Sequence, residues 1–153
     1  MNDMKRSRKI SERLMKAGAA ATLAGALFTA GALPAFAGTA SSPFQAGPNI
    51  EHRSIVTTNS QSGTARSEAG PTSSTRAAGE VGGMGRAFNS SGALVNQSAW
   101  SYSNQPLNVG ARWGGTTSFS GKGSYYSQGA VQYWTNGRYT TVTAPRTTNQ
   151  TIG

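Results

Sequence analysis

The chain of 153 residues contains no cysteine and a single histidine, and it holds only five acidic residues against fourteen lysines and arginines. The absence of cysteine excludes disulfide bonds, thiolate catalysis and cysteine-ligated metals. One histidine excludes metal sites built from several imidazoles. The length allows one domain of ordinary size rather than two.

The residues that usually carry catalysis are missing from a whole half of the chain, because no Asp, Glu, His or Cys follows Glu80. General acid–base catalysis needs a group that titrates near the working pH, and a nucleophilic Ser or Thr needs a base beside it. Divalent metals need carboxylate, imidazole or thiolate ligands. We therefore expect a protein that is not an enzyme and has no metal or other cofactor. The remaining routes to catalysis are a serine with Lys122 as its base, or His52 with Glu51.

Residues 1–37 have the pattern of a secretory signal peptide. Six basic residues precede an uncharged stretch at 17–33, and the small residues Ala35 and Ala37 occupy the two positions that a signal peptidase recognises. The apolar stretch is shorter than the roughly 20 residues that span a bilayer. The sequence thus predicts a secreted bacterial protein, cleaved near Ala37-Gly38, whose mature chain has no transmembrane segment. Attachment to the cell surface is the alternative location.

Residues 38–80 are rich in Ser, Thr, Ala, Gly and Pro and contain one aromatic residue, Phe44. Such a segment buries too little apolar surface to offset the entropy of ordering the chain, so we predict that it is disordered. It would serve as a linker, a wall-spanning spacer or a removed propeptide. The local exception is 50–57, where Ile55 and Val56 favour a short strand.

The composition changes at Val81, because ten of the eleven aromatic residues beyond residue 37 lie in 81–153. Apolar residues in this part alternate with a period of two, which indicates strands. Short loops separate them, so neighbouring strands should be antiparallel. We predict an all-β domain, a small antiparallel meander of four to six strands that closes as a barrel or folds as a sandwich. The predicted strands are 94–102, 107–113, 116–120, 125–135 and 138–144.

The last two strands meet at Asn136-Gly137, a residue pair that strongly favours a two-residue hairpin turn. Such a turn fixes the register, because each residue before it has a set partner after it. The face with Val131, Tyr133 and Val142 is the better candidate for a core, and the other face presents Trp134 outward. The predicted pairs are Thr135–Arg138, Trp134–Tyr139, Tyr133–Thr140 and Val131–Val142.

The predicted β domain carries five cations and no acidic side chain, so no salt bridge inside it could neutralise them. Each cation must face solvent or an external anion. Arginine also suits phosphate through its bidentate fork. Net charge that keeps the protein soluble is the alternative explanation. The candidate anion-binding residues are Arg86, Arg112, Lys122, Arg138 and Arg146.

Aromatic side chains give a second candidate site. Trp134 with Tyr139, or Trp100 with Tyr102, would form a flat platform for sugar rings, while packing of the core is the competing role for these rings. Basic and aromatic residues together also bind single-stranded nucleic acid, but export argues against that partner.

These patterns predict a secreted, non-enzymatic protein whose cationic β domain binds an anionic or glycan component of a cell envelope. The partner would be a cell-wall polymer, a wall precursor or an anionic lipid surface. In class the chain is similar to the secreted, cysteine-free bacteriocins of the lactococcin 972 type, which share a signal peptide and a Gly-, Trp- and Tyr-rich β domain. That similarity implies an antimicrobial that acts on the envelope of competing bacteria. A self-assembling surface protein is a third hypothesis, because self-association would stabilise a small domain without disulfides.

Overall fold

The computed structural model describes residues 37–153, so the predicted signal peptide, apart from its last residue, lies outside the described residues. The described part of the chain forms thirteen β-strands, and all their pairings are antiparallel. The all-β antiparallel class predicted from the sequence is therefore confirmed. Within 37–153, no helix is long and apolar enough to cross a membrane.

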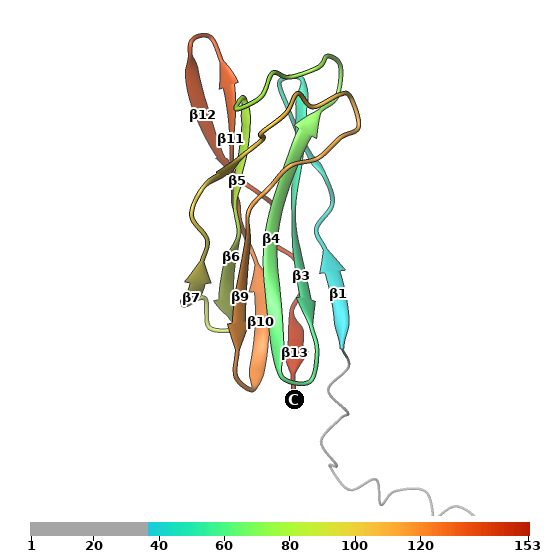
Figure 1. Cartoon of the computed structure of the whole chain (residues 1–153). Coiled ribbons are helices and arrows are strands. Elements are labelled where there is room, and N and C mark those ends of the chain that lie inside the picture. Colours follow the sequence, from blue (N-terminus) through green and yellow to red (C-terminus); the bar gives the residue numbers. More distant parts are fainter. Residues whose placement is uncertain (1–36) are drawn as a thin grey trace, which may run out of the picture. The chain divides into compact units, whose positions relative to one another are not determined.

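One layer of the fold is a five-stranded sheet, here called the N-terminal sheet. Its strand order is β1-β3-β4-β9, and β2 pairs with β3 beside β1. The centre is the long hairpin of β3 and β4, paired from Ile50–Pro71 to Thr58–Gly63. Figure 1 shows β1, β3, β4 and β9 as neighbours. The bounds are β1 (Gly38–Ser41), β2 (Gln45–Gly47), β3 (Ile50–Thr58), β4 (Ser62–Pro71) and β9 (Thr116–Ser120).

The structure differs from the prediction that residues 38–80 are a disordered linker or propeptide. Four strands of the N-terminal sheet come from this segment, and β4 pairs with β9 of the predicted β domain. The short strand expected at 50–57 is β3, in which every second residue is buried. Several of the inward side chains are small or polar, such as Ser54 and Ala65. They provide little apolar surface, but they allow the two layers to approach closely, so one folded unit extends from β1 to the C-terminus.

The second layer consists of two four-stranded sheets placed end to end. The hairpin sheet has the order β12-β11-β5-β8, and the C-terminal sheet has the order β13-β10-β6-β7. β5 continues into β6 across Gly85, and β10 continues into β11 across 128–129, so both sheets share two interrupted central strands. The bounds are β5 (Val81–Met84), β6 (Arg86–Asn89), β7 (Leu94–Gln97), β8 (Ser101–Tyr102), β10 (Gly123–Ser127), β11 (Ala130–Thr135), β12 (Arg138–Thr143) and β13 (Gln150–Ile152).

Some predicted strands are present and others are not. The strand at 116–120 and the hairpin at 125–144 are confirmed, although residues 128–129 divide the first hairpin strand. The segment 94–102 is also divided, since β7 and β8 belong to different sheets. The prediction of a strand at 107–113 is wrong. Gly110 has a φ of 88° and the Ala111 N–H donates to the carbonyl of Asn108, so the chain turns in the middle of the segment.

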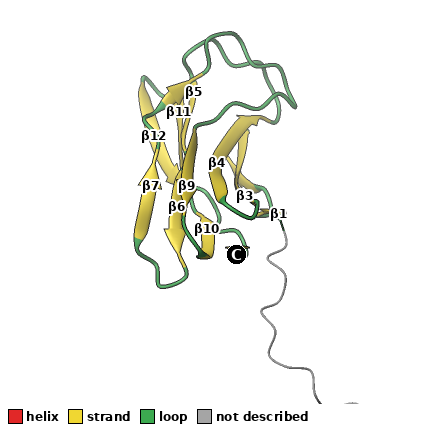
Figure 2. Ribbon diagram, turned by 60° about the horizontal axis from the view of Figure 1, so that its bottom comes forward, coloured by secondary structure: helices red, strands yellow, loops and turns green. Residues whose placement is uncertain are grey.

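Two separate hydrophobic clusters fill the space between the layers, which face each other in Figure 2. Val131 and Tyr133 belong to one of them, as the hairpin register predicts, and Val142 packs against that cluster. The cluster under the C-terminal sheet is Ala40, Val56, Ala65, Ala87, Phe119, Tyr125 and Ile152. The cluster under the hairpin sheet is Ile50, Ala69, Val81, Leu107, Val131, Tyr133 and Ala144.

Between these clusters lies a thin serine–glycine layer, formed by Ser54, Ser67, Gly114 and Gly129. The Gly129 N–H donates to Ser54 Oγ at 3.0 Å, and Ser67 Oγ donates to the carbonyl of Ala130 at 3.1 Å. A Cβ at Gly114 or Gly129 would overlap with Ser67. The backbones of the two layers therefore meet here, and hydroxyl groups replace apolar side chains as the contact between them.

Candidate functional site

The five candidate anion-binding cations do not gather at one place. Lys122 precedes β10 and Arg138 follows β11, and these consecutive strands extend through both sheets of the second layer. The two residues therefore lie at opposite ends of that layer, in the β9–β10 turn and in the β11–β12 hairpin (Figure 1). Both are exposed.

Arg86 and Arg146 lie against aromatic rings on the outer side of the C-terminal sheet. The guanidinium carbon of Arg86 is 5.6 Å from the centroid of Phe88, and that of Arg146 is 3.6 Å from the centroid of Tyr126. The two rings stack at 5.2 Å with an interplanar angle of 11°. Arg86 Nε also donates to the carbonyl of Gln128 at 3.1 Å. These two cations thus contribute to packing through cation–π contacts and a backbone hydrogen bond.

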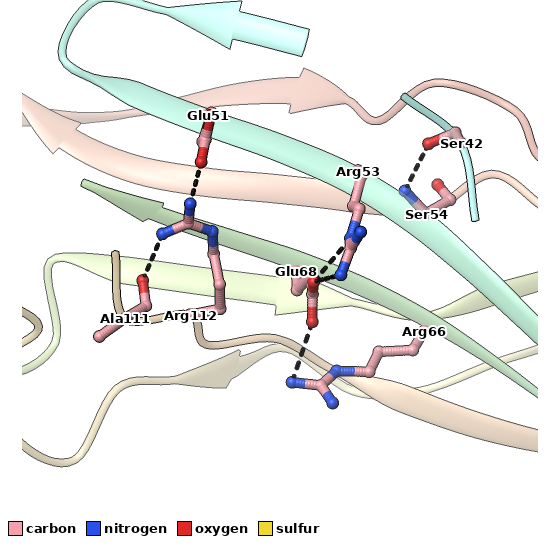
Figure 3. A network of polar contacts seen from close by, with 8 residues as sticks. All are labelled: Ser42, Glu51, Arg53, Ser54, Arg66, Glu68, Ala111 and Arg112. Carbon is pink, nitrogen blue, oxygen red and sulfur yellow. Dashed lines mark hydrogen bonds and ion pairs between the residues drawn. The ribbon is translucent and has the colours of Figure 1, made fainter. Parts of the chain in front are cut away.

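Arg112 has an internal partner, which contradicts the prediction that the five cations have no salt bridge available. It forms an ion pair with Glu51 of β3 (Figure 3). Its Nη1 donates to the carbonyl of Ala111 at 2.9 Å. Burial lowers the pKa of Arg112. The prediction failed because it left Glu51 outside the predicted β domain, whereas β3 brings this carboxylate to the folded surface.

A second ion network, absent from the sequence predictions, lies beside the first one. The buried Glu68 accepts from Arg53 at 2.7 Å and pairs with Arg66 at 3.3 Å (Figure 3). Phe44 connects the two networks, because its ring centroid is 4.3 Å from the guanidinium carbon of Arg53 and 5.1 Å from that of Arg112. The two guanidinium groups hold the loop before β2 against the N-terminal sheet, which is a structural role.

The four candidate platform residues, in contrast, lie together on the outer face of the hairpin sheet. The ring centroids of Trp134 and Tyr139 are 4.9 Å apart, those of Tyr139 and Tyr102 are 5.2 Å apart, and those of Tyr102 and Trp100 are 6.2 Å apart. Trp134, Tyr139 and Tyr102 are 38%, 41% and 36% exposed. The structure joins the two predicted pairs into one feature, which we call the aromatic row.

Hydrogen bonds and a glycine fix the two tyrosines of the row. Tyr102 comes from the edge strand β8 and donates to Gln132 Oε1 on β11, so its ring covers Gly82 of the intervening β5. A Cβ at residue 82 would lie 2.6 Å from Tyr102 Cδ1. Tyr139 comes from the opposite edge strand β12, and its hydroxyl donates to the carbonyl of Gly79 at 2.7 Å. Burial, and then the neighbouring Tyr139, raise the pKa of Tyr102.

The surroundings of the aromatic row are polar but nearly uncharged. Gln132 Nε2 donates to Thr141 Oγ1 at 2.9 Å, which places an amide and a hydroxyl beside the rings. Arg138 is the one charged residue within the four strands of the hairpin sheet. It neighbours Tyr139 in sequence and so alternates to the other side of β12. At the edge of the row, Arg76 Nη1 donates to the carbonyl of Trp134 at 3.0 Å.

One route to catalysis that the sequence left open, His52 with Glu51, is not assembled into one site. His52 is 3% exposed and faces the interior, whereas its neighbour Glu51 points outward to Arg112. Adjacent residues of a strand face opposite sides, so these two groups cannot act on one substrate. Among residues 37–153 there is no group of three or more His, Asp or Glu side chains that could hold a metal ion.

Comparison with protein families found no match, and comparison with curated proteins found none either. Among solved structures, the beta-glucosidase 3B from Thermotoga neapolitana in complex with glycerol aligns with a TM-score of 0.30 and 12% sequence identity. The alignment covers 76% of this chain and 17% of the glucosidase. A similarity of this size assigns neither a fold family nor a function, so the function must be argued from the surface of the protein.

Proposed function

We propose that the protein is a secreted, non-enzymatic bacterial binding protein that attaches to a component of a cell envelope through its aromatic row. The observation that carries the proposal is that four aromatic side chains lie in contact and partly exposed on one sheet face. Large aromatic side chains that gather on a surface, rather than in a core, are typical of binding sites.

Three further observations support the proposal. The rings are held by the contacts Tyr102–Gln132 and Tyr139–Gly79, so little side-chain entropy is lost when a ligand binds. In residues 1–37 a basic start is followed by an uncharged stretch. This pattern is typical of a signal peptide, which would bring the protein to the outside of the cell. The lack of titratable catalytic groups after Glu80 favours binding over catalysis.

Co-sedimentation of the purified mature protein with isolated bacterial cell walls tests this function. We expect the wild-type protein to pellet with the walls, and we expect Trp134→Ala to reduce the bound fraction strongly. Val109→Ala is the matched control, since Val109 is 54% exposed but lies in the loop before β9, outside the row. Failure of the wild-type protein to pellet at any salt concentration would show the proposal to be wrong.

The source of the envelope can be assigned in the same series. Growth inhibition of related bacteria by the wild-type protein, but not by Trp134→Ala, would indicate an antimicrobial that acts on competitors. Binding to the producer's own walls without growth inhibition would indicate a component of the producing cell's surface.

A further inference from the structure

We propose that the ligand of the aromatic row is an uncharged oligosaccharide, bound across the strands β12, β11, β5 and β8. This inference rests on the proposed function and names the class of ligand for that site. It replaces the anionic polymer that the net charge of the sequence favours.

The first argument concerns charge. Some of the cations that could attract an anionic polymer have partners away from the row: Arg112 pairs with Glu51, and Arg146 lies over Tyr126. Lys122 and Arg138 lie at the two ends of the second layer. Arg76, at the edge of the row, donates to a backbone carbonyl. A phosphate or carboxylate over Tyr102 and Trp100 would therefore lose water without gaining a counterion, which is unfavourable, whereas Arg76 keeps its charge at the Trp134 end of the row.

The second argument concerns the shape of the surface. One face of the Tyr102 ring covers Gly82, so the opposite face points away from the sheet. Trp100 stacks with it at a centroid distance of 6.2 Å and an interplanar angle of 26°, so these two rings are close to parallel. A pyranose ring presents a flat patch of C–H groups, which pack on an aromatic face as other apolar surfaces do. Tyr102 and Trp100 together provide such a surface.

The third argument concerns size. The row extends from Trp134 through two tyrosines to Trp100 by three successive centroid distances of 4.9, 5.2 and 6.2 Å. Trp134 meets Tyr139 at 78°, so the end of the row formed by Trp134 offers a ring in a different plane from the Tyr102 end. A single sugar ring covers one or two of these aromatic rings, and a ligand that uses the whole row must contain several sugars.

The fourth argument concerns the polar groups beside the rings. Gln132 accepts from Tyr102 and donates one amide hydrogen to Thr141, which leaves its second amide hydrogen free for a ligand. The hydroxyl oxygen of Thr141 has a further lone pair. Both groups suit the hydroxyl groups of a sugar, and their internal hydrogen bonds fix their positions in advance.

Binding to a fixed panel of four uncharged polysaccharides tests this inference: cellulose, chitin, xylan and mannan. We expect the mature protein to bind at least one of them, with an affinity that changes less than about twofold between low salt and roughly 0.5 M NaCl. Trp134→Ala and Gln132→Ala should each weaken binding at least about tenfold. Trp134→Phe keeps an aromatic face and should restore most of the affinity, and Lys122→Ala should bind as the wild type does.

The outcomes separate this inference from the proposed function. Binding to none of the four polysaccharides overturns the inference. Wall binding that disappears in high salt and in Lys122→Ala, but persists in Trp134→Ala, also overturns it and points to an anionic polymer. In the first case the proposed function stands as long as the wild-type protein pellets with walls and Trp134→Ala does not. In the second case attachment through the aromatic row is overturned as well. Circular dichroism of each variant confirms that it is folded before its binding is compared.

Discussion

Tyr102 and Tyr139 extend from opposite edge strands of the hairpin sheet and meet above its two central strands, with ring centroids 5.2 Å apart. Each ring is tethered by its own hydroxyl, Tyr102 to Gln132 and Tyr139 to the carbonyl of Gly79. The aromatic row therefore combines segments that are distant in sequence, and its geometry depends on the residues beneath the rings as well as on the rings.

Gly82→Val is expected to move Tyr102 off the sheet, because a Cβ at this position would lie 2.6 Å from the Tyr102 ring. The free energy of unfolding should fall by about 1–3 kcal/mol, and binding to walls should fall with it. Urea denaturation and co-sedimentation measure the two effects. In a Tyr102→Ala background, where the ring is absent, the same substitution should cost much less stability. An equal cost in both backgrounds would contradict the contact.

Gly114→Ala is expected to destabilise the fold by more than about 3 kcal/mol, since its methyl group would overlap with the backbone of Ser67. Gly110→Ala is the control. Gly110 has a φ of 88°, and no atom lies within 4 Å of a Cβ built there. Gly110→Ala should therefore lower the free energy of unfolding only through backbone strain, by about 1–2 kcal/mol. Chemical denaturation of both variants measures the difference, and equal losses would show that the two layers are not in backbone contact at Gly114.

Glu51→Gln is expected to lower stability by about 1 kcal/mol, because Arg112 then loses the partner that compensates its partial burial. The side chains of Arg112 and Glu51 are 19% and 26% exposed, so solvent screens part of the interaction. A double-mutant cycle with Arg112→Met isolates the coupling between the two residues. The idea is refuted by a coupling energy indistinguishable from zero at low salt.

His52 should make the protein less stable in weak acid. Burial lowers the pKa of His52 below its ordinary 6.5, and the nearby backbone of Thr143 opposes this less strongly. As the pH falls, the unfolded chain therefore takes up a proton at a higher pH than the folded chain does. The contribution of neutral His52 to the free energy of unfolding is fully present above about pH 6.5, and it is lost as the pH falls toward the lower pKa of the folded state. Urea midpoints measured from about pH 7.5 to 5.5 should show this decline. His52→Gln should flatten the curve in that window, and an unchanged slope would count against the assignment.

A fragment that begins at Val81 should not fold alone, because β4 supplies the neighbour of β9 and residues of β3 and β4 complete both hydrophobic clusters. We expect its circular dichroism to resemble an unfolded chain, while the fragment 38–153 gives a cooperative thermal transition. A cooperative transition in the shorter fragment would support the original interpretation of 38–80 as a linker.

Local sequence patterns predicted the hairpin of β11 and β12 in detail. All four expected pairs from Thr135–Arg138 to Val131–Val142 are present, and Asn136 and Gly137 have the positive φ angles, 51° and 76°, that a tight two-residue turn requires. The outward position of Trp134 and Tyr139 followed from that register. The contact of Tyr139 with Tyr102 could not be predicted, because it depends on the pairing of β8 with β5, which is not encoded in a local pattern.

Of the four strands in residues 38–71 only β3 was predicted, and the others were missed for a physical reason. Their alternation is regular, but the inward positions include Ser54 and Ser67, whose burial is possible because the Gly129 N–H and the carbonyl of Ala130 satisfy their hydroxyl groups. A prediction based on apolar content does not detect buried strands whose inward side chains are hydrogen-bonded serines. The same error changed the interpretation of the site, since the carboxylates of Glu51 and Glu68 were left out of the folded domain and the arginines were taken to be unpaired.

The serine–glycine layer has a consequence for how the protein tolerates change. It divides the interior into two compartments, and the partition between them is made of backbone and short serine side chains, which cannot be repacked as larger side chains can. A substitution such as Phe119→Leu in one compartment and Val131→Ala in the other should therefore have additive effects on stability. A substitution beneath the aromatic row should then change the support of the proposed binding face, while the packing of the compartment at the other end is kept.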